Sequence, residues 1–438
     1  MPAAPSGVTL RAYDVGFGDC FLLSFNYAQA QKHILIDFGS TRLPAGKTGT
    51  GSYLERIARQ VEADCGGKLT AVVATHRHKD HISGFATSGK EADKGPGAII
   101  RGLKPDLVLQ PWTEHPDAER EAIKPPKRLT GVRLQRNLYL RSLRDMNRYA
   151  GHVRTLAKTL RGSSLKPMRE QLDFLGDDNE LANRPAVVNL MTMGRLKARY
   201  LHCGAPSGLE PLLPGVKVHV LGPPTLEQDA RISSQTATQQ DEFWHLRASF
   251  WARRSALDTG PARRAPPLFP RHLRKKAPWD ARWYKYQSQR ELAESMLSIV
   301  RRLDDAMNNT SLILLFEIGD TCLLFPGDAQ WENWRYALDQ PKYRKLLSRV
   351  TVYKVGHHGS LNATPKSMWK ELAHRGGKSK PNRLLSLLST KDGVHGSKGG
   401  ESEVPRKKLV DTLGKESTLI DTRDTKAAEL RITQELSL

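Results

Sequence analysis

Six consecutive residues carry four side chains of the kind that binds metal ions. The segment His76–His81 reads His-x-His-x-Asp-His, and a run of small and β-branched residues precedes it. Imidazole and carboxylate suit Zn²⁺ and similar divalent ions. A buried strand ending in this motif predicts a metal site, against the alternative of a solvated strand exit. Alternation along an extended segment places His76, His78 and Asp80 on one side, and a turn then brings His81 to a second metal.

Three other positions in the chain place similar groups directly after short apolar runs. Asp37 precedes Phe-Gly, Asp328 follows Pro-Gly, and the pair His357 and His358 follows Lys-Val-Gly. A carboxylate at Asp37 can orient a metal-bound imidazole by accepting its other N–H. A carboxylate at Asp328 can bridge two metal ions. Each position therefore supplies a group that a two-metal site needs.

These motifs, in this order, resemble those of the metallo-β-lactamase fold. Together with the glycine-rich segment Asp14–Asp19, they resemble most the soluble hydrolase domain of the ComEC-type competence proteins. The resemblance implies an αββα sandwich that holds two divalent metal ions, Zn²⁺ or alternatively Mn²⁺, with a bridging hydroxide as nucleophile. The ligands that it implies are His76, His78, Asp80, His81, His202, Asp328, His357 and His358.

Several roles stay open at the level of sequence. His202 is equally well interpreted as the third histidine of the first metal or as a core or surface residue. One of His357 and His358 completes the second metal shell, and the other is an orienting group or the general acid. Asp80 binds metal and also steers the nucleophile. Lys354 pairs with phosphate or is an ordinary surface lysine, and the second interpretation is favoured.

Other histidines lack a supporting motif. We expect His115, His219 and His245 to be structural, and we consider His395 a candidate for the rim of the site. The aspartates of the glycine-rich turn, Asp14 and Asp19, are expected to approach the metals closely because the glycines leave room.

Length and composition favour one elaborated domain over residues 1–438. The hydrophobic content of 39% is low for this length and predicts one core with polar insertions. A basic helical insertion is predicted at 113–183, and a basic, aromatic-rich one at 225–306. The α/β scaffold around them is predicted from strands near 8–40, 69–74, 107–109, 216–221, 309–316, 321–325, 350–355 and 383–388, with helices near 52–63, 291–307 and 365–374.

The charge and the cysteines limit the partners and the cellular location. The formal net charge is +22, which favours a polyanionic partner such as nucleic acid. The four cysteines are far apart in sequence, so neither a zinc ribbon nor an oxidising compartment is required. Neither a signal peptide nor an apolar run long enough to cross a bilayer is recognisable, so we expect no membrane partner and a cytoplasmic protein.

We therefore expect a metal-dependent hydrolase that cleaves nucleic-acid phosphodiester bonds. The resemblance to a DNA-handling family and the mixture of arginine with tryptophan and tyrosine in the second insertion support this substrate. Two alternatives remain: a small-molecule phosphodiesterase or related hydrolase, and a partner-binding scaffold whose site is vestigial or activated by a partner. The catalytic residues that we expect are Asp80, His358 and Asp37.

Overall fold

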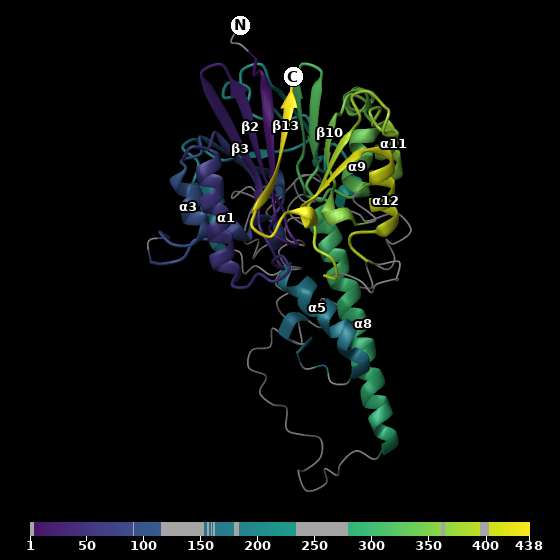
Figure 1. Cartoon of the computed structure of the whole chain (residues 1–438). Coiled ribbons are helices and arrows are strands. Elements are labelled where there is room, and N and C mark those ends of the chain that lie inside the picture. The colour runs from purple at the N-terminus through teal and green to yellow at the C-terminus, as the bar shows by residue number, and fades with distance from the viewer. Residues whose placement is uncertain are drawn as a thin grey trace, which may run out of the picture.

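Two mixed β-sheets form the centre of the molecule (Figure 1). The computed structural model describes residues 4–90, 92–114, 153–155, 157–158, 160, 163–178, 184–233, 279–360, 364–394 and 403–438. The first sheet has the strand order β13 (Arg431–Ser437), β1 (Gly7–Tyr13), β2 (Cys20–Tyr27), β3 (Ala30–Phe38), β4 (Ala71–Val73), β5 (Leu107–Pro111) and β6 (Arg199–Leu201). The second has the order β12 (Thr418–Asp421), β11 (Leu385–Leu388), β10 (Val352–Lys354), β9 (Thr321–Phe325), β8 (Ile313–Ile318) and β7 (Lys217–Gly222).

The two sheets repeat one topology. In the first, β1, β2 and β3 pair antiparallel, and β3 to β6 pair parallel. In the second, β7, β8 and β9 pair antiparallel, and β9 to β12 pair parallel. Strand β3 therefore corresponds to β9, and β4 to β10. No repeat is visible in the sequence, because alternating apolar residues specify such strands equally well with different side chains.

The main core lies between the sheets. Apolar side chains from β1 to β5 of one sheet and from β7 to β11 of the other form a single buried cluster. Phe21 packs edge-on against Phe325 with ring centroids 5.8 Å apart, and Phe25 lies 6.1 Å from Phe316. Strands that are apolar on both faces can bury the opposite face only under helices, so each sheet requires an outer helical layer.

Helices cover both outer faces, which makes this a four-layer α/β protein. On the first sheet lie α1 (Thr50–Asp64), α3 (Pro96–Gly102) and α6 (Arg184–Thr192). Helix α1 buries Leu54, Ile57, Ala58 and Val61, as the helical spacing of this segment predicts. On the second lie α9 (Trp331–Leu338), α10 (Pro341–Leu347), α11 (Lys366–Glu371) and α12 (Lys407–Glu416).

A pair of helices lies beyond these layers, at the lower end of the molecule in Figure 1. They are α5 (Lys166–Asp178), within the first predicted insertion, and α8 (Trp279–Asn308), within the second. The described residues of the predicted insertions thus include these helices beside turns and single 3-10 turns. The prediction for the rest of the insertions, including most of their arginines and two of their four tryptophans, lies outside the described residues. Within the described ranges no helix is long and apolar enough to cross a membrane.

Candidate metal centre

The predicted metal motifs meet at the edge where corresponding strands of the two sheets end. Asp37 lies at the end of β3, and the His76–His81 motif follows β4. Asp328 follows β9, and the histidine pair follows β10. Because β3 and β4 correspond to β9 and β10, equivalent loops of the two halves supply the site.

The predicted alternation is wrong at Asp80. Extended backbone continues to His78, whose φ and ψ are −60° and 151°, and Asp80 then lies inside the single helical turn α2 (Lys79–Ile82). A helix rotates successive side chains by about 100°. In a strand, successive side chains point to opposite faces, whereas in a helical turn two neighbouring side chains can lie on the same side. Asp80 and His81 therefore both point inward, and both are buried.

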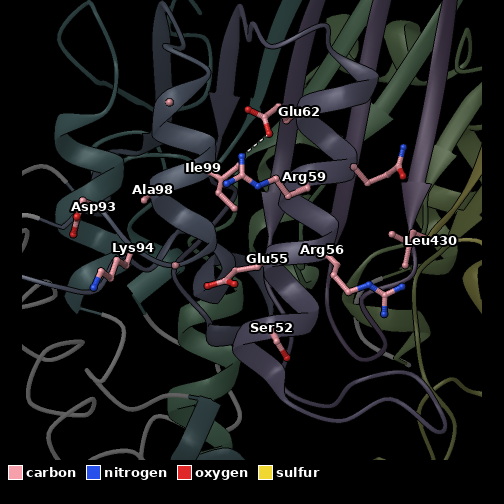
Figure 2. A pocket seen from close by; sticks show the side chains of 13 residues that line it. Ser52, Glu55, Arg56, Arg59, Glu62, Asp93, Lys94, Ala98, Ile99 and Leu430 are labelled. Atoms are coloured by element: carbon pink, nitrogen blue, oxygen red, sulfur yellow. Dashed lines mark hydrogen bonds and ion pairs between the residues drawn. The ribbon is translucent and has the colours of Figure 1, made fainter.

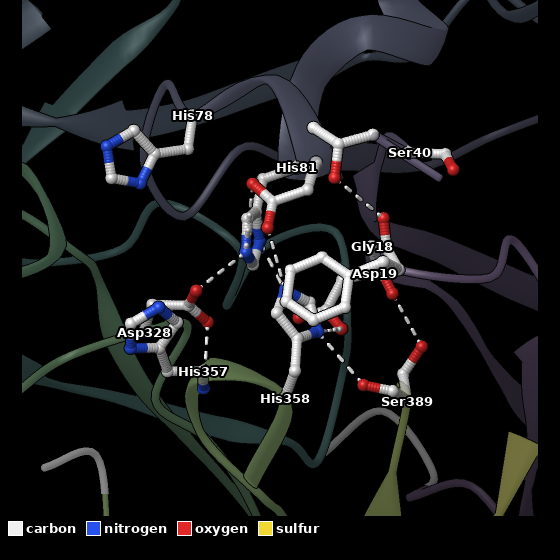
Figure 3. Close-up of polar contacts among 12 residues, drawn as sticks. Gly18, Asp19, Ser40, His78, His81, Asp328, His357, His358 and Ser389 are labelled. Carbon is white, nitrogen blue, oxygen red and sulfur yellow. Dashed lines mark hydrogen bonds and ion pairs between the residues drawn. The ribbon is translucent and has the colours of Figure 1, made fainter. Parts of the chain in front are cut away.

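Four buried side chains converge on one point (Figure 3). One ligand atom each from Asp80, His81, Asp328 and His358 lies within 4.8 Å of the other three. Nε2 of His358 is 2.7 Å from Oδ2 of Asp80, and Nε2 of His81 is 3.0 Å from Oδ2 of Asp328. We call these residues the four-residue cluster. It includes His358 and not His357.

Two further carboxylates approach His81 from its other side. Oδ2 of Asp37 is 2.8 Å from Nδ1 of His81, and Oδ2 of Asp19 is 3.6 Å away. Asp37 also accepts hydrogen bonds of 2.7 Å from both the backbone N–H and the hydroxyl of Thr75. The carboxylate of Asp37 is therefore held where it can accept a hydrogen bond from Nδ1–H of His81. Nε2 of His81 then faces Asp328.

His76 and His78 form a separate pair beside the four-residue cluster. Nε2 of His76 is 3.0 Å from Nδ1 of His78, and the ring centroid of His76 is 4.2 Å from that of His81. Asp304 of α8, which the sequence did not single out, lies near this pair. Its Oδ1 is 3.9 Å from Nε2 of His78.

His202 is not brought into either group. It follows β6, is half-buried, and its Nδ1 lies 3.0 Å from the carbonyl oxygen of Cys203. Among the described residues, the groups of three or more side chains whose geometry could hold a metal ion include neither His202 nor the pair of His76 and His78. The structure thus gives no support to His202 as a third ligand beside His76 and His78.

The histidines share one arrangement: one ring nitrogen faces the other candidate ligands, and an oxygen holds the second nitrogen. Nδ1 of His358 donates to the carbonyl of Ser389 at 2.9 Å. Nδ1 of His76 lies 3.2 Å from the hydroxyl of Thr75. His81 has the same arrangement through Asp37. Metal-binding histidines are typically held in this way, because the outer hydrogen bond fixes the ring and its tautomer.

The chemistry of the four-residue cluster fits a divalent cation. Oδ1 of Asp80 is buried and accepts no hydrogen bond from any described residue. A buried carboxylate oxygen left in this way is costly, and a bound cation removes the cost. Two carboxylates and two imidazoles also form a donor set suited to Zn²⁺ or Mn²⁺.

Lys354 is buried, so the favoured interpretation of it as a surface lysine is wrong. Its side chain is 2% exposed, and its ammonium group forms an ion pair with Asp19 and lies 3.4 Å from Oδ1 of Asp328. Lysine is almost never buried unless it is paired, and the sequence gives no sign of the pairing partner. Burial lowers the pKa of Lys354, but Asp19 and Asp328 outweigh burial and raise the pKa above its usual value.

Opposing effects also set the protonation of the four-residue cluster. Burial lowers the pKa of His81, but the surrounding carboxylates, Asp328 first among them, outweigh burial and raise it well above its usual value. Burial raises the pKa of Asp80, but His81 and His358 together lower it below its usual range. Asp80 therefore stays ionised near neutral pH, as a metal ligand must be, and His81 has to release a proton when a metal ion binds.

The backbone is strained where it presents these groups. Asp37, His357 and His358 have positive φ values of 55°, 43° and 51°. Such values are uncommon outside glycine and tend to occur at functional sites. Gly39 is required for a different reason: an added Cβ would lie 2.5 Å from the carbonyl carbon of Asp80. The loop that carries Asp80 can approach β3 only because no side chain intervenes.

The other predicted residues are placed less centrally. The backbone N–H of His357 donates to Oδ1 of Asp328 at 3.0 Å, and its ring lies 3.0 Å from the hydroxyl of Ser360. His219 pairs with Glu317 at 2.7 Å across β7 and β8, which agrees with a structural role. The predictions for His115, His245 and His395 lie outside the described residues.

A surface groove of about 1020 Å³ lies between α1 and α3 (Figure 2). Charges of both signs line it, among them the ion pair of Arg59 with Glu62, and no residue of the four-residue cluster does. Its lining contains no histidine or cysteine, and among the described residues the groups that could hold a metal ion lie in the loops described above. No protein-family model matches the chain, and no curated protein is significantly similar to it in sequence.

Proposed function

We propose that this protein is a metal-dependent hydrolase of the metallo-β-lactamase type that cleaves phosphodiester bonds in nucleic acid. The observation that carries the proposal is the four-residue cluster, where Asp80 and His81 of one half meet Asp328 and His358 of the other. The repeated strand order supports the fold assignment, since it gives the two similar halves that such a fold requires.

The residues divide into ligands and groups that hold them. Asp80, His81, Asp328 and His358 would hold a divalent ion, and His76 with His78 would hold a second. A bound divalent ion supplies Lewis acidity, which lowers the pKa of water and stabilises negative charge on the group under attack. Asp37 would orient His81 by accepting a hydrogen bond from its Nδ1–H. The ring of His357 contacts Ser360 and is not one of the four ligands. We therefore assign to His357 the transfer of a proton and not the binding of a metal ion.

The choice of nucleic acid rests on charge. The chain carries 68 lysines and arginines against 46 acidic residues. Several of the acidic residues are buried at the site itself, so the exposed surface carries a larger excess of positive charge. A surface of this sign attracts phosphate backbones and releases their counterions, so binding is expected to weaken steeply with salt.

The test is cleavage of labelled single- and double-stranded DNA and RNA with Zn²⁺ or Mn²⁺. Cleavage should be lost on chelation and in Asp80→Ala. It should persist in Asp320→Ala, which removes an exposed carboxylate from the turn between β8 and β9. Turnover of a chromogenic phosphodiester with the nucleic acids left intact would indicate a small-molecule phosphodiesterase. Bound metal without turnover of either substrate would favour the scaffold alternative.

A further inference from the structure

Helix α8 reaches the candidate metal centre from outside the two-sheet scaffold. Its residues Ala293, Met296, Leu297 and Val300 are buried against Leu172 and Leu175 of α5, so the two helices form a packed pair. Near its C-terminal end the helix turns Asp304 toward the site. The side chain of Asp304 is 13% exposed and its Oδ1 lies 3.9 Å from Nε2 of His78.

The side chain of Asp304 is held in place from within its own helix. The amide of Asn308, one turn further along and fully buried, donates to Oδ2 of Asp304 at 3.3 Å. This contact leaves Oδ1 as the oxygen nearer to His78. His78 and Asp304 then repeat the arrangement of His76, His81 and His358. In each of these histidines, the ring nitrogen that faces away from the other candidate ligands lies next to an oxygen.

We propose that Asp304 is a positioning residue: when a metal ion is bound, its carboxylate accepts a hydrogen bond from Nε2–H of His78, and so leaves the lone pair of Nδ1 of His78 facing Nε2 of His76. The separation of 3.9 Å is longer than a hydrogen bond, and such contacts commonly tighten when a site is loaded. This proposal rests on the proposed function, because it requires that the His76 and His78 pair binds a metal ion. It makes the second insertion part of the metal centre.

A second contact joins the helix pair to the other half of the site. Phe174 of α5 packs edge-on against Phe17 at 5.8 Å, and the ring of Phe17 lies 4.3 Å from that of His358. Helix α5 also contacts α2, the turn that carries Asp80 and His81. Metal binding and the docking of α5 and α8 are therefore coupled, and each should strengthen the other.

The test measures Zn²⁺ affinity and stoichiometry in the full chain and in three variants. Asp304→Asn keeps the size of the side chain but not its charge, and should weaken one class of Zn²⁺ site by about 10- to 100-fold. Asp304→Glu can still reach His78 and should bind within about 3-fold of the wild type. Glu294→Gln, an exposed charge on the same helix, should change nothing.

Two further readouts separate positioning from general damage. Co²⁺ loaded in place of Zn²⁺ should show an altered visible spectrum in Asp304→Asn, while the chelated variant melts like the chelated wild type. Zn²⁺ should slow amide exchange in α8 of the wild type and do so less in the variant. Zn²⁺ binding in Asp304→Asn equal to that of a metal-binding wild type would overturn this proposal alone. A wild type that binds no Zn²⁺ would overturn the proposed function and this proposal with it.

Discussion

Replacing Lys354 with methionine removes a buried positive charge and keeps most of the side-chain volume. The side chain of Lys354 is 2% exposed, and that of its partner Asp19 is fully buried. Neither carboxylate oxygen of Asp19 has a hydrogen bond that would compensate for the loss of this ion pair. The variant therefore leaves an uncompensated charge in the interior of the protein.

Removing one partner of a buried ion pair typically costs about 3–5 kcal/mol. Solvent screening does not reduce this figure here, because both partners are buried. We expect Lys354→Met to lower the free energy of unfolding by that amount in the presence of a chelator. Removing both charges, in Asp19→Asn combined with Lys354→Met, should cost less than the single change because Asp19 no longer carries an unpaired charge, although Asp328 still loses its contact with Lys354.

The assay is urea unfolding followed by circular dichroism, with Lys370→Met as the matched control. Lys370 is exposed on α11, and its loss should change stability by less than about 0.5 kcal/mol. Saturating Zn²⁺ should restore part of the stability of Lys354→Met, because an ion that binds only the native state stabilises it. A single variant that loses less than about 1 kcal/mol, or a double variant as unstable as the single one, would refute the reasoning.

Three other outcomes follow from the same geometry. His202→Ala should retain the Zn²⁺ stoichiometry and affinity of the wild type in equilibrium dialysis, and a loss of one ion would restore His202 as a ligand. Gly39→Ala should weaken metal binding, because the added Cβ must push the Asp80 loop away, and unchanged affinity would show that the close approach is unimportant. Burial lowers the pKa of His33 to about 4, so between that value and its unfolded pKa of about 6.5 the unfolded chain binds more protons. The wild type should therefore lose about 2–3 kcal/mol as pH falls through this window, and His33→Gln should lose correspondingly less in parallel urea titrations.

The scaffold could be predicted from the sequence because its signals are local. Apolar runs that end in aspartate or histidine mark strands whose ends carry candidate metal ligands or the groups that orient them, and the segments before Asp37, His76 and Asp328 are such strands. Helix α1 was predicted from its spacing for the same reason. Each of these inferences needs only a few neighbouring residues.

What the sequence could not provide depends on contacts between distant residues. Lys354 was interpreted as exposed because its partner Asp19 precedes it by hundreds of residues. Asp304 is one of many acidic residues on a polar helix, and only the packing of that helix brings it to His78. The choice of His358 over His357 depends on the direction in which a left-handed backbone turn points each ring.

The most direct test of the central claim is the metal content of the protein after dialysis against Zn²⁺ or Mn²⁺. Elemental analysis would compare the wild type with Asp80→Ala and Asp328→Ala, and circular dichroism would show that the variants are folded. We predict that the wild type retains at least one ion per chain and that both variants lose it. A wild type that emerges free of metal, or folded variants that retain as much as the wild type, would contradict the assignment of a metal centre to these residues.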